Sequence, residues 1–131
     1  MIGLDTNVIV RLLVQDDEAQ VKRVEKAIAE QCSEESPATI NAIVLAETVW
    51  VLGSAYQYEN TEIVSAIEAL LQVKVFEVQY HNEAWEALHL FEDGKGGFAD
   101  LYLAAINRHL GCSTTLTFDK KAAGNAGFAL I

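Results

Sequence analysis

Met1-Ile2-Gly3-Leu4-Asp5-Thr6-Asn7 is the stretch that decides the fold. Its residues 2–4 are apolar and predict a short strand, and Thr6-Asn7 supplies good N-cap residues for a helix over the apolar run 8–13. Asp5 therefore lies where a strand gives way to a helix. Because open α/β sheets bind ligands beyond the carboxyl ends of their strands, Asp5 is either a ligand-binding carboxylate or a simple helix cap.

Strands and helices are predicted to alternate along the rest of the chain. Further strands are expected at 38–40, 73–78, 112–118 and 128–131. Helices are expected from about 17 to 28, then at 42–52, 61–71, 82–91, 98–110 and 120–123. Asp17, Asn41 and residue 60 or 61 are the predicted caps of the helices that follow them, and Arg23 falls at a polar position of the helix 17–28. This alternation predicts a mostly parallel sheet with helices on both faces. The sequence has no repeat, linker or low-complexity tract, so we expect residues 1–131 to form one compact α/β domain.

Composition narrows the class of protein. A chain of 131 residues, 51% of them hydrophobic, can bury the core of one domain. No apolar run reaches the ~18 residues of a membrane span, no signal peptide is evident, and two cysteines are too few for a disulfide framework. A cytoplasmic location is therefore expected. The net charge of -10 argues against binding nucleic acid through a broad basic face, and it allows binding of cations or of a basic partner.

Glu47 is the second acid of interest. With Thr48 it is the only polar residue in the run 42–52, and a helix that is apolar on nearly all sides is expected to be buried. A buried carboxylate is costly unless it is paired or binds a metal. Glu47 is therefore expected to be a metal ligand, or else the partner of a cation such as Arg11 or a glutamate that reaches solvent.

Asp100 and Asp119 repeat the pattern. Asp100 lies in the first turn of an apolar helix, where the helix dipole also favours an acid. Asp119 follows the apolar strand that ends at Phe118, where it could also cap the short helix 120–123. Two of the four acids thus follow strands and two interrupt apolar helices. We expect all four to lie along one edge of the sheet.

Carboxylates do not gather without a cation. At ~4 Å, two like charges repel by about 1 kcal/mol in water and about 4 kcal/mol at an effective dielectric constant of 20. A divalent cation makes the same arrangement favourable. Oxygen ligands without His or Cys favour Mg²⁺ or Mn²⁺ over zinc. His81, His89 and His109 are expected to be solvated.

The order and spacing of these motifs resemble the PIN domain, and most closely its VapC-type toxins of bacterial toxin–antitoxin pairs. The resemblance covers the whole chain and implies a three-layer α/β/α sandwich with a central sheet of four to five strands. It also implies a Mg²⁺-dependent endoribonuclease that cleaves RNA phosphodiesters with metal-activated water. The motifs that carry it are Leu4-Asp5-Thr6-Asn7-Val8, Glu47 after Asn41, Phe98-Ala99-Asp100 and Leu116-Thr117-Phe118-Asp119-Lys120-Lys121. On these motifs Asp5, Glu47, Asp100 and Asp119 match the catalytic, metal-binding acids, and Thr6 and Thr117 match polar positions that often line the site.

The resemblance further implies an antitoxin partner whose basic segment places an Arg among the acids. A homodimer or a toxin–antitoxin hetero-oligomer is expected, with the first four helices as contact surfaces. One residue departs from the pattern: several relatives carry another Asp where this chain has Gly97, which would weaken a second metal site. The alternative function is a catalytically inactive acidic domain of the same fold that binds RNA or a basic peptide. The RNA target and the number of metals are left open.

Other classes fit the sequence less well. A receiver domain requires an Asp after a central strand, and this chain has no Asp between Asp17 and Asp93. A dehalogenase-type phosphatase requires Asp-x-Asp at the first strand, where Asn7 takes the second place. The glycines at 94–97 do not follow a strand, so they do not form a P-loop.

Overall fold

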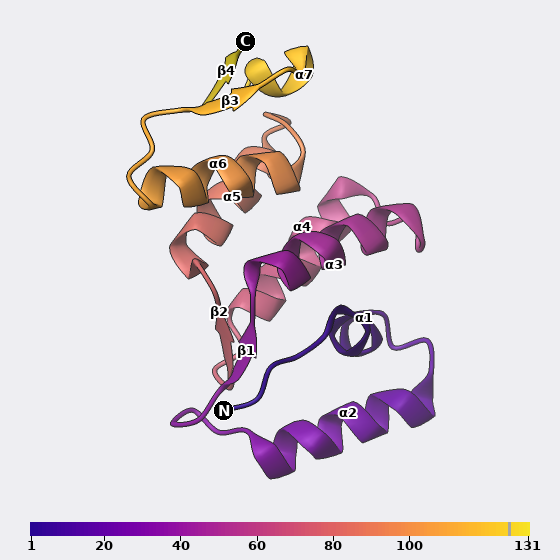
Figure 1. Cartoon of the computed structure of the whole chain (residues 1–131). Coiled ribbons are helices and arrows are strands. Elements are labelled where there is room, and N and C mark those ends of the chain that lie inside the picture. Colours follow the sequence, from indigo (N-terminus) through magenta and orange to yellow (C-terminus); the bar gives the residue numbers. More distant parts are fainter. Residues whose placement is uncertain (126) are drawn as a thin grey trace. The chain divides into compact units, whose positions relative to one another are not determined.

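The structure is a computed structural model that describes residues 1–125 and 127–131. These residues form two compact units, Met1–Gln79 and Tyr80–Ile131. The elements of the first unit are α1 (Thr6–Val14), α2 (Glu18–Gln31), β1 (Ala38–Ile40), α3 (Ala42–Ser54), α4 (Asn60–Leu71) and β2 (Phe76–Val78) (Figure 1). Those of the second are α5 (His81–Glu92), α6 (Phe98–His109), β3 (Thr115–Thr117), α7 (Lys120–Ala123) and β4 (Phe128–Leu130).

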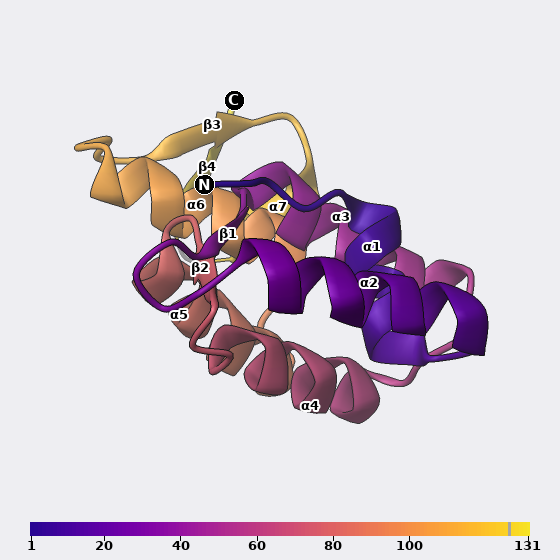
Figure 2. The ribbon, with the colours of Figure 1, turned by 90° about the horizontal axis from the view of Figure 1, so that it is seen from below.

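The first unit is built on a parallel pair of strands. β1 pairs with β2 so that Ala38 faces Phe76, and the two strands run side by side in both views (Figures 1 and 2). The segment predicted as the first strand lies along β1. There the Leu4 amide donates to the Thr39 carbonyl at 2.9 Å, and the Thr39 amide donates to the Ile2 carbonyl at 2.7 Å. This contact is a single bridge at Gly3 and not a full strand.

Side-chain caps fix where the helices of the first unit begin. Asp17 caps α2 and Asn41 caps α3, as predicted, by accepting the amide of the third residue beyond. α1 begins earlier than predicted, because Asp5 caps it in place of Thr6-Asn7. α4 was predicted to be capped by residue 60 or 61, but its cap is Glu59, in a reciprocal capping box with Glu62.

The core of the first unit lies between helices α1, α3 and α4 and strand β1. Its fully buried side chains include Ile9, Ile40, Leu45, Leu52 and Ile67. On α4 the apolar residues at helical spacing, Ile63, Ile67 and Leu70 among them, form the buried face.

One face of α3 contradicts the prediction of a buried helix. Ile43 and Trp50 are 77% and 70% exposed, and Glu47 between them is exposed as well. These residues are four and three positions apart and therefore share one face of the helix. α3 is apolar all round, yet only the face that carries Leu45, Val49 and Leu52 is buried. Uniform hydrophobicity carries no information about which face is covered.

The second unit is a helix pair followed by a strand–helix–strand motif. α5 and α6 pack side by side through aromatic contacts. The ring centroid of Phe98 lies 6.4 Å from that of Phe91 and 5.3 Å from that of Tyr102. β3 then pairs with β4 in parallel, Thr115 facing Phe128, and the single-turn helix α7 connects them.

The predicted α/β class and the parallel pairing of strands agree with the structure. The four strands after the first are all present, three of them shorter than predicted. They form two two-stranded sheets, so a single sheet of four to five strands is not shown. In the part of the chain that the structure describes, no helix has the length and apolar character needed to cross a membrane.

The buried Tyr102 should make the free energy of unfolding depend on pH in the alkaline range. Burial raises the pKa of this phenol above its ordinary value of 10.0, and the nearby Glu83 and Tyr80 add to the effect. The folded protein therefore keeps Tyr102 neutral where the unfolded chain ionises it. Stability is full below pH 10 and falls above it by up to about 1.4 kcal/mol per pH unit for this group. Tyr102→Phe should make the decline shallower in urea unfolding between pH 8 and 11, and equal slopes would contradict this account.

Candidate active site

Thr6 joins two of the predicted acids in the first unit. Asp5 Oδ1 accepts the Thr6 amide at 2.7 Å, and the Thr6 hydroxyl donates to Glu47 Oε1. Thr6 itself is only 4% exposed, so its hydroxyl is held in place by the packing of α1. The contact links the start of α1 to the middle of α3. Asp5 and Glu47, 42 residues apart in sequence, thus share one threonine.

The remaining oxygens of this pair are available to a ligand. Asp5 and Glu47 are both exposed. Asp5 Oδ2 and Glu47 Oε2 accept no hydrogen bond from residues 1–125 or 127–131. Carboxylate oxygens are the hard ligands that Mg²⁺ and Mn²⁺ prefer, so the donor chemistry of this pair fits the predicted metal.

The alternative in which Glu47 pairs with Arg11 does not describe this unit. Arg11 forms an ion pair with Asp16 and donates to the hydroxyl of Tyr56. Its guanidinium also lies over the Tyr56 ring, 5.8 Å from the centroid. Glu47 is instead exposed and accepts a hydrogen bond from the Thr6 hydroxyl. This agrees with the alternative in which its side chain reaches solvent, and not with a buried ion pair.

The second unit contains the other two acids, each at the start of a helix. Asp100 lies in the first turn of α6 and is half-buried. Asp119 caps α7, its Oδ1 accepting the amides of Lys121 at 2.8 Å and Ala122 at 3.4 Å. The amide of Asp119 donates in turn to Thr117 Oγ1 at 3.0 Å. Thr117 thus contacts a predicted acid, as Thr6 does.

Each unit by itself contains two of the four acids. Within residues 1–125 and 127–131, no three His, Cys, Asp or Glu side chains are grouped closely enough to hold a metal ion. The gathering of all four acids stays a prediction. His81, His89 and His109 are exposed, as expected.

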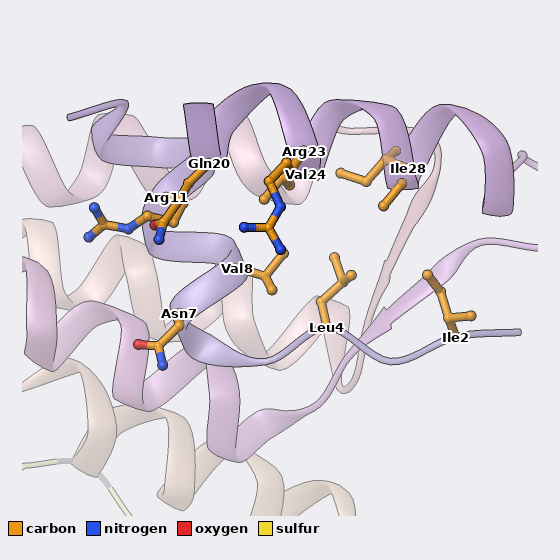
Figure 3. A pocket seen from close by; sticks show the side chains of 10 residues that line it. Ile2, Leu4, Asn7, Val8, Arg11, Gln20, Arg23, Val24 and Ile28 are labelled. Atoms are coloured by element: carbon orange, nitrogen blue, oxygen red, sulfur yellow. The ribbon is translucent and has the colours of Figure 1, made fainter. Parts of the chain in front are cut away.

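A pocket that the sequence did not reveal lies in the first unit, between α2 and the segment that leads into α1. Its volume is about 380 Å³. Figure 3 shows Ile2 and Leu4 pointing toward α2 and Ile28 pointing back toward them. At the other end stand Arg11 and Arg23, two of the three arginines in the chain. Arg23 had been assigned to the polar face of α2, and only the packing of α2 against α1 brings it over an apolar floor.

Arg23 differs from Arg11 in lacking a partner. No carboxylate or carbonyl of the described residues accepts a hydrogen bond from it or pairs with it. The pocket therefore combines an apolar floor with an unpaired cation, although the chain as a whole carries a net charge of -10.

Comparison with known proteins assigns the chain to a family. The sequence model of the PIN domain family matches residues 2–127, nearly the whole chain, and the protein belongs to that family. The chain is also similar to a protein of Aquifex aeolicus (strain VF5) named VapC ribonuclease. The two are 24% identical over 118 residues, which cover 90% of this chain and 87% of the relative.

The bond between Thr6 and Glu47 is testable without any ligand. In a double-mutant cycle of Thr6→Val and Glu47→Ala, we expect a coupling of about 0.5–1.5 kcal/mol in the free energy of unfolding, the usual worth of one such hydrogen bond. Val keeps the buried methyl group and removes only the donor. Additive effects of the two substitutions in urea unfolding would show that the hydroxyl does not hold Glu47.

Proposed function

We propose that this protein is a Mg²⁺-dependent endoribonuclease and the toxin of a toxin–antitoxin pair. Membership of the PIN family and similarity to a VapC ribonuclease support the class of activity. The observation that carries the proposal is the pair Asp5 and Glu47, joined by Thr6 with one oxygen of each left free. A carboxylate pair held by a buried hydroxyl costs repulsion, and a bound cation removes that cost.

The four acids would meet if both pairs of strands belong to one sheet. In this proposal the sheet has four to five mostly parallel strands, and helices cover both faces in a three-layer sandwich. Asp5 comes two residues after the bridge at Gly3, and Asp119 comes two residues after the end of β3. The carboxyl ends of parallel strands lie at one edge of a sheet. α3 and α6 would add Glu47 and Asp100 from either side.

In the mechanism we propose, Asp5, Glu47, Asp100 and Asp119 hold one or two Mg²⁺ ions against a phosphodiester of RNA. When bound, Mg²⁺ lowers the pKa of a coordinated water and stabilises negative charge on phosphoryl oxygens. Thr6 keeps Glu47 at a fixed position beside Asp5, and Thr117 does the same for the backbone of Asp119. Lys120 and Lys121, both exposed beside Asp119, offer cations to the neighbouring phosphates.

Removal of one acid should abolish cleavage with the fold intact. Asp5→Asn or Asp100→Asn is expected to lower RNA cleavage by at least about a hundredfold, because each removes a charged oxygen ligand. Both variants should also lose most of the rise in melting temperature that Mg²⁺ gives the wild type by mass action. Asp93→Asn, at an exposed position after α5, is the matched control and should leave both measurements unchanged.

The same experiment separates the proposal from its alternative. If the protein is an inactive acidic domain that binds RNA or a basic peptide, purified wild type freed of host nucleases will bind RNA without cutting it. Full cleavage by Asp5→Asn would exclude the predicted metal site.

The antitoxin is the second part of the proposal. A basic segment of that partner would place an Arg among the acids, since a guanidinium pairs with carboxylates through two hydrogen bonds. The pocket between α1 and α2 suits another segment of the partner, with apolar side chains over Leu4 and Ile28 and a carboxylate opposite Arg23. Ile43 and Trp50, exposed on α3, supply a surface for a homodimer or for the hetero-oligomer.

A charge reversal tests the use of the pocket. Arg23→Glu should weaken antitoxin binding at least about tenfold, because a carboxylate pair would replace an ion pair next to an apolar contact. Lys22→Glu is the matched control. Lys22 is the neighbouring residue on α2, is exposed and pairs only loosely with Glu18 at 3.5 Å. Equal changes in Kd for the two variants would show that the partner does not use the pocket.

A further inference from the structure

Contacts among the described residues of the second unit attach the strand–helix–strand motif to α6 and to the loop before it at three places. Asn107 Nδ2 donates to Thr115 Oγ1 at 2.8 Å. Gly127 lies so close to Ala104 that a Cβ at residue 127 would be 3.0 Å from the Ala104 Cβ. The third contact joins Asn125 to Gly96, where a Cβ would lie 2.8 Å from Cγ and 2.9 Å from Oδ1 of Asn125. The carboxamide therefore occupies the space that a side chain at residue 96 would need.

The position of the third contact distinguishes it from the other two. Ala104 and Asn107 lie in the second half of α6, away from its acid. Gly96 immediately precedes Gly97, the N-cap of α6, and Asp100 lies in the first turn that follows. Asn125 comes two residues after the end of α7, the helix that Asp119 caps. The contact of Asn125 with Gly96 thus connects the two segments that carry the acids of this unit.

The loop before α6 needs such a contact. Its sequence Gly94-Lys95-Gly96-Gly97 contains three glycines, and glycine has the widest backbone freedom of any residue. Gly96 has a φ of 148°, which other residues rarely adopt. A glycine is required here both by this conformation and by the close approach of the carboxamide.

We propose that Asn125 is a positioning residue that sets the separation of Asp100 and Asp119 by packing against Gly96. In the proposed metal site, this separation determines how well Asp100 and Asp119 bind Mg²⁺ or Mn²⁺ together. The expected effect on metal affinity rests on the function proposed above. The expected effect on the separation of Asp100 and Asp119 does not depend on that function.

The geometric part is measured by the distance between two spin labels. Labels attached through Ala99→Cys and Lys120→Cys lie next to Asp100 and Asp119 at exposed positions, in a chain with Cys32→Ser and Cys112→Ser. We expect one narrow distance distribution in this background and a broader or shifted one when Asn125→Ala is added. Asn82→Ala makes the same chemical change at an exposed position of α5 and should leave the distribution narrow.

The functional part is measured by Mn²⁺ binding to the unlabelled, full-length protein, followed by the EPR signal of the free ion. Asn125→Ala should raise the Kd for Mn²⁺ about tenfold, the scale on which residues that support metal ligands act. Asn82→Ala should leave the Kd unchanged. Cleavage by Asn125→Ala should approach the wild-type rate at saturating Mn²⁺, because all four acids remain in place.

The outcomes are distinct. An unchanged label distance in Asn125→Ala overturns the proposal. A changed distance with an unchanged Kd for Mn²⁺ overturns the claim that this contact positions metal ligands. If wild type binds no Mn²⁺, the proposed metal-dependent function fails, while the label distances still decide whether Asn125 sets the separation of Asp100 and Asp119.

Discussion

The contact of the Thr6 hydroxyl with Glu47 is the interaction on which the candidate site depends. It fixes a side chain of α3 beside the start of α1, where Asp5 caps the helix. An exposed glutamate otherwise samples many rotamers, and ordering one costs conformational entropy. Thr6 is buried in its own helix and holds Glu47 through its hydroxyl. Part of the side-chain entropy of Glu47 is therefore lost on folding, and less is lost when a cation binds.

Capping and ligand binding are compatible roles for the same carboxylate. For Asp5 and Asp119, the sequence left open a choice between a helix cap and a functional acid. Each uses Oδ1 to accept backbone amides, and this leaves Oδ2 for another partner. The amides at a helix N-terminus also stabilise the negative charge. A cap therefore orients the carboxylate and lowers the cost of placing it near other acids.

Two of the helix caps could be predicted from local sequence, whereas the features that depend on packing could not. Asp17 and Asn41 cap their helices as predicted because a cap depends on residues within one turn. The exposure of Glu47 could not be read from α3, because a helix that is apolar all round does not indicate which face is covered. The pocket under Arg23 was missed for a related reason, since it exists only where α2 packs against α1. β2 and β3 each begin three residues later than predicted, because the ends of a short strand depend on its pairing with a distant segment.

A net charge of -10 repels a substrate made of phosphates, but salt limits the range of that repulsion. At physiological ionic strength the Debye length is about 8 Å, so acids on remote helices contribute little at the site. The electrostatic potential at a bound phosphate is therefore set by the charged groups next to it. Four carboxylates alone would repel it, whereas the same carboxylates around one or two divalent cations, with Lys120 and Lys121 beside them, present a much less negative surface. In the function we propose, the ion therefore permits RNA to approach as well as to react. The same acids, without the ion, favour the basic segment of an antitoxin.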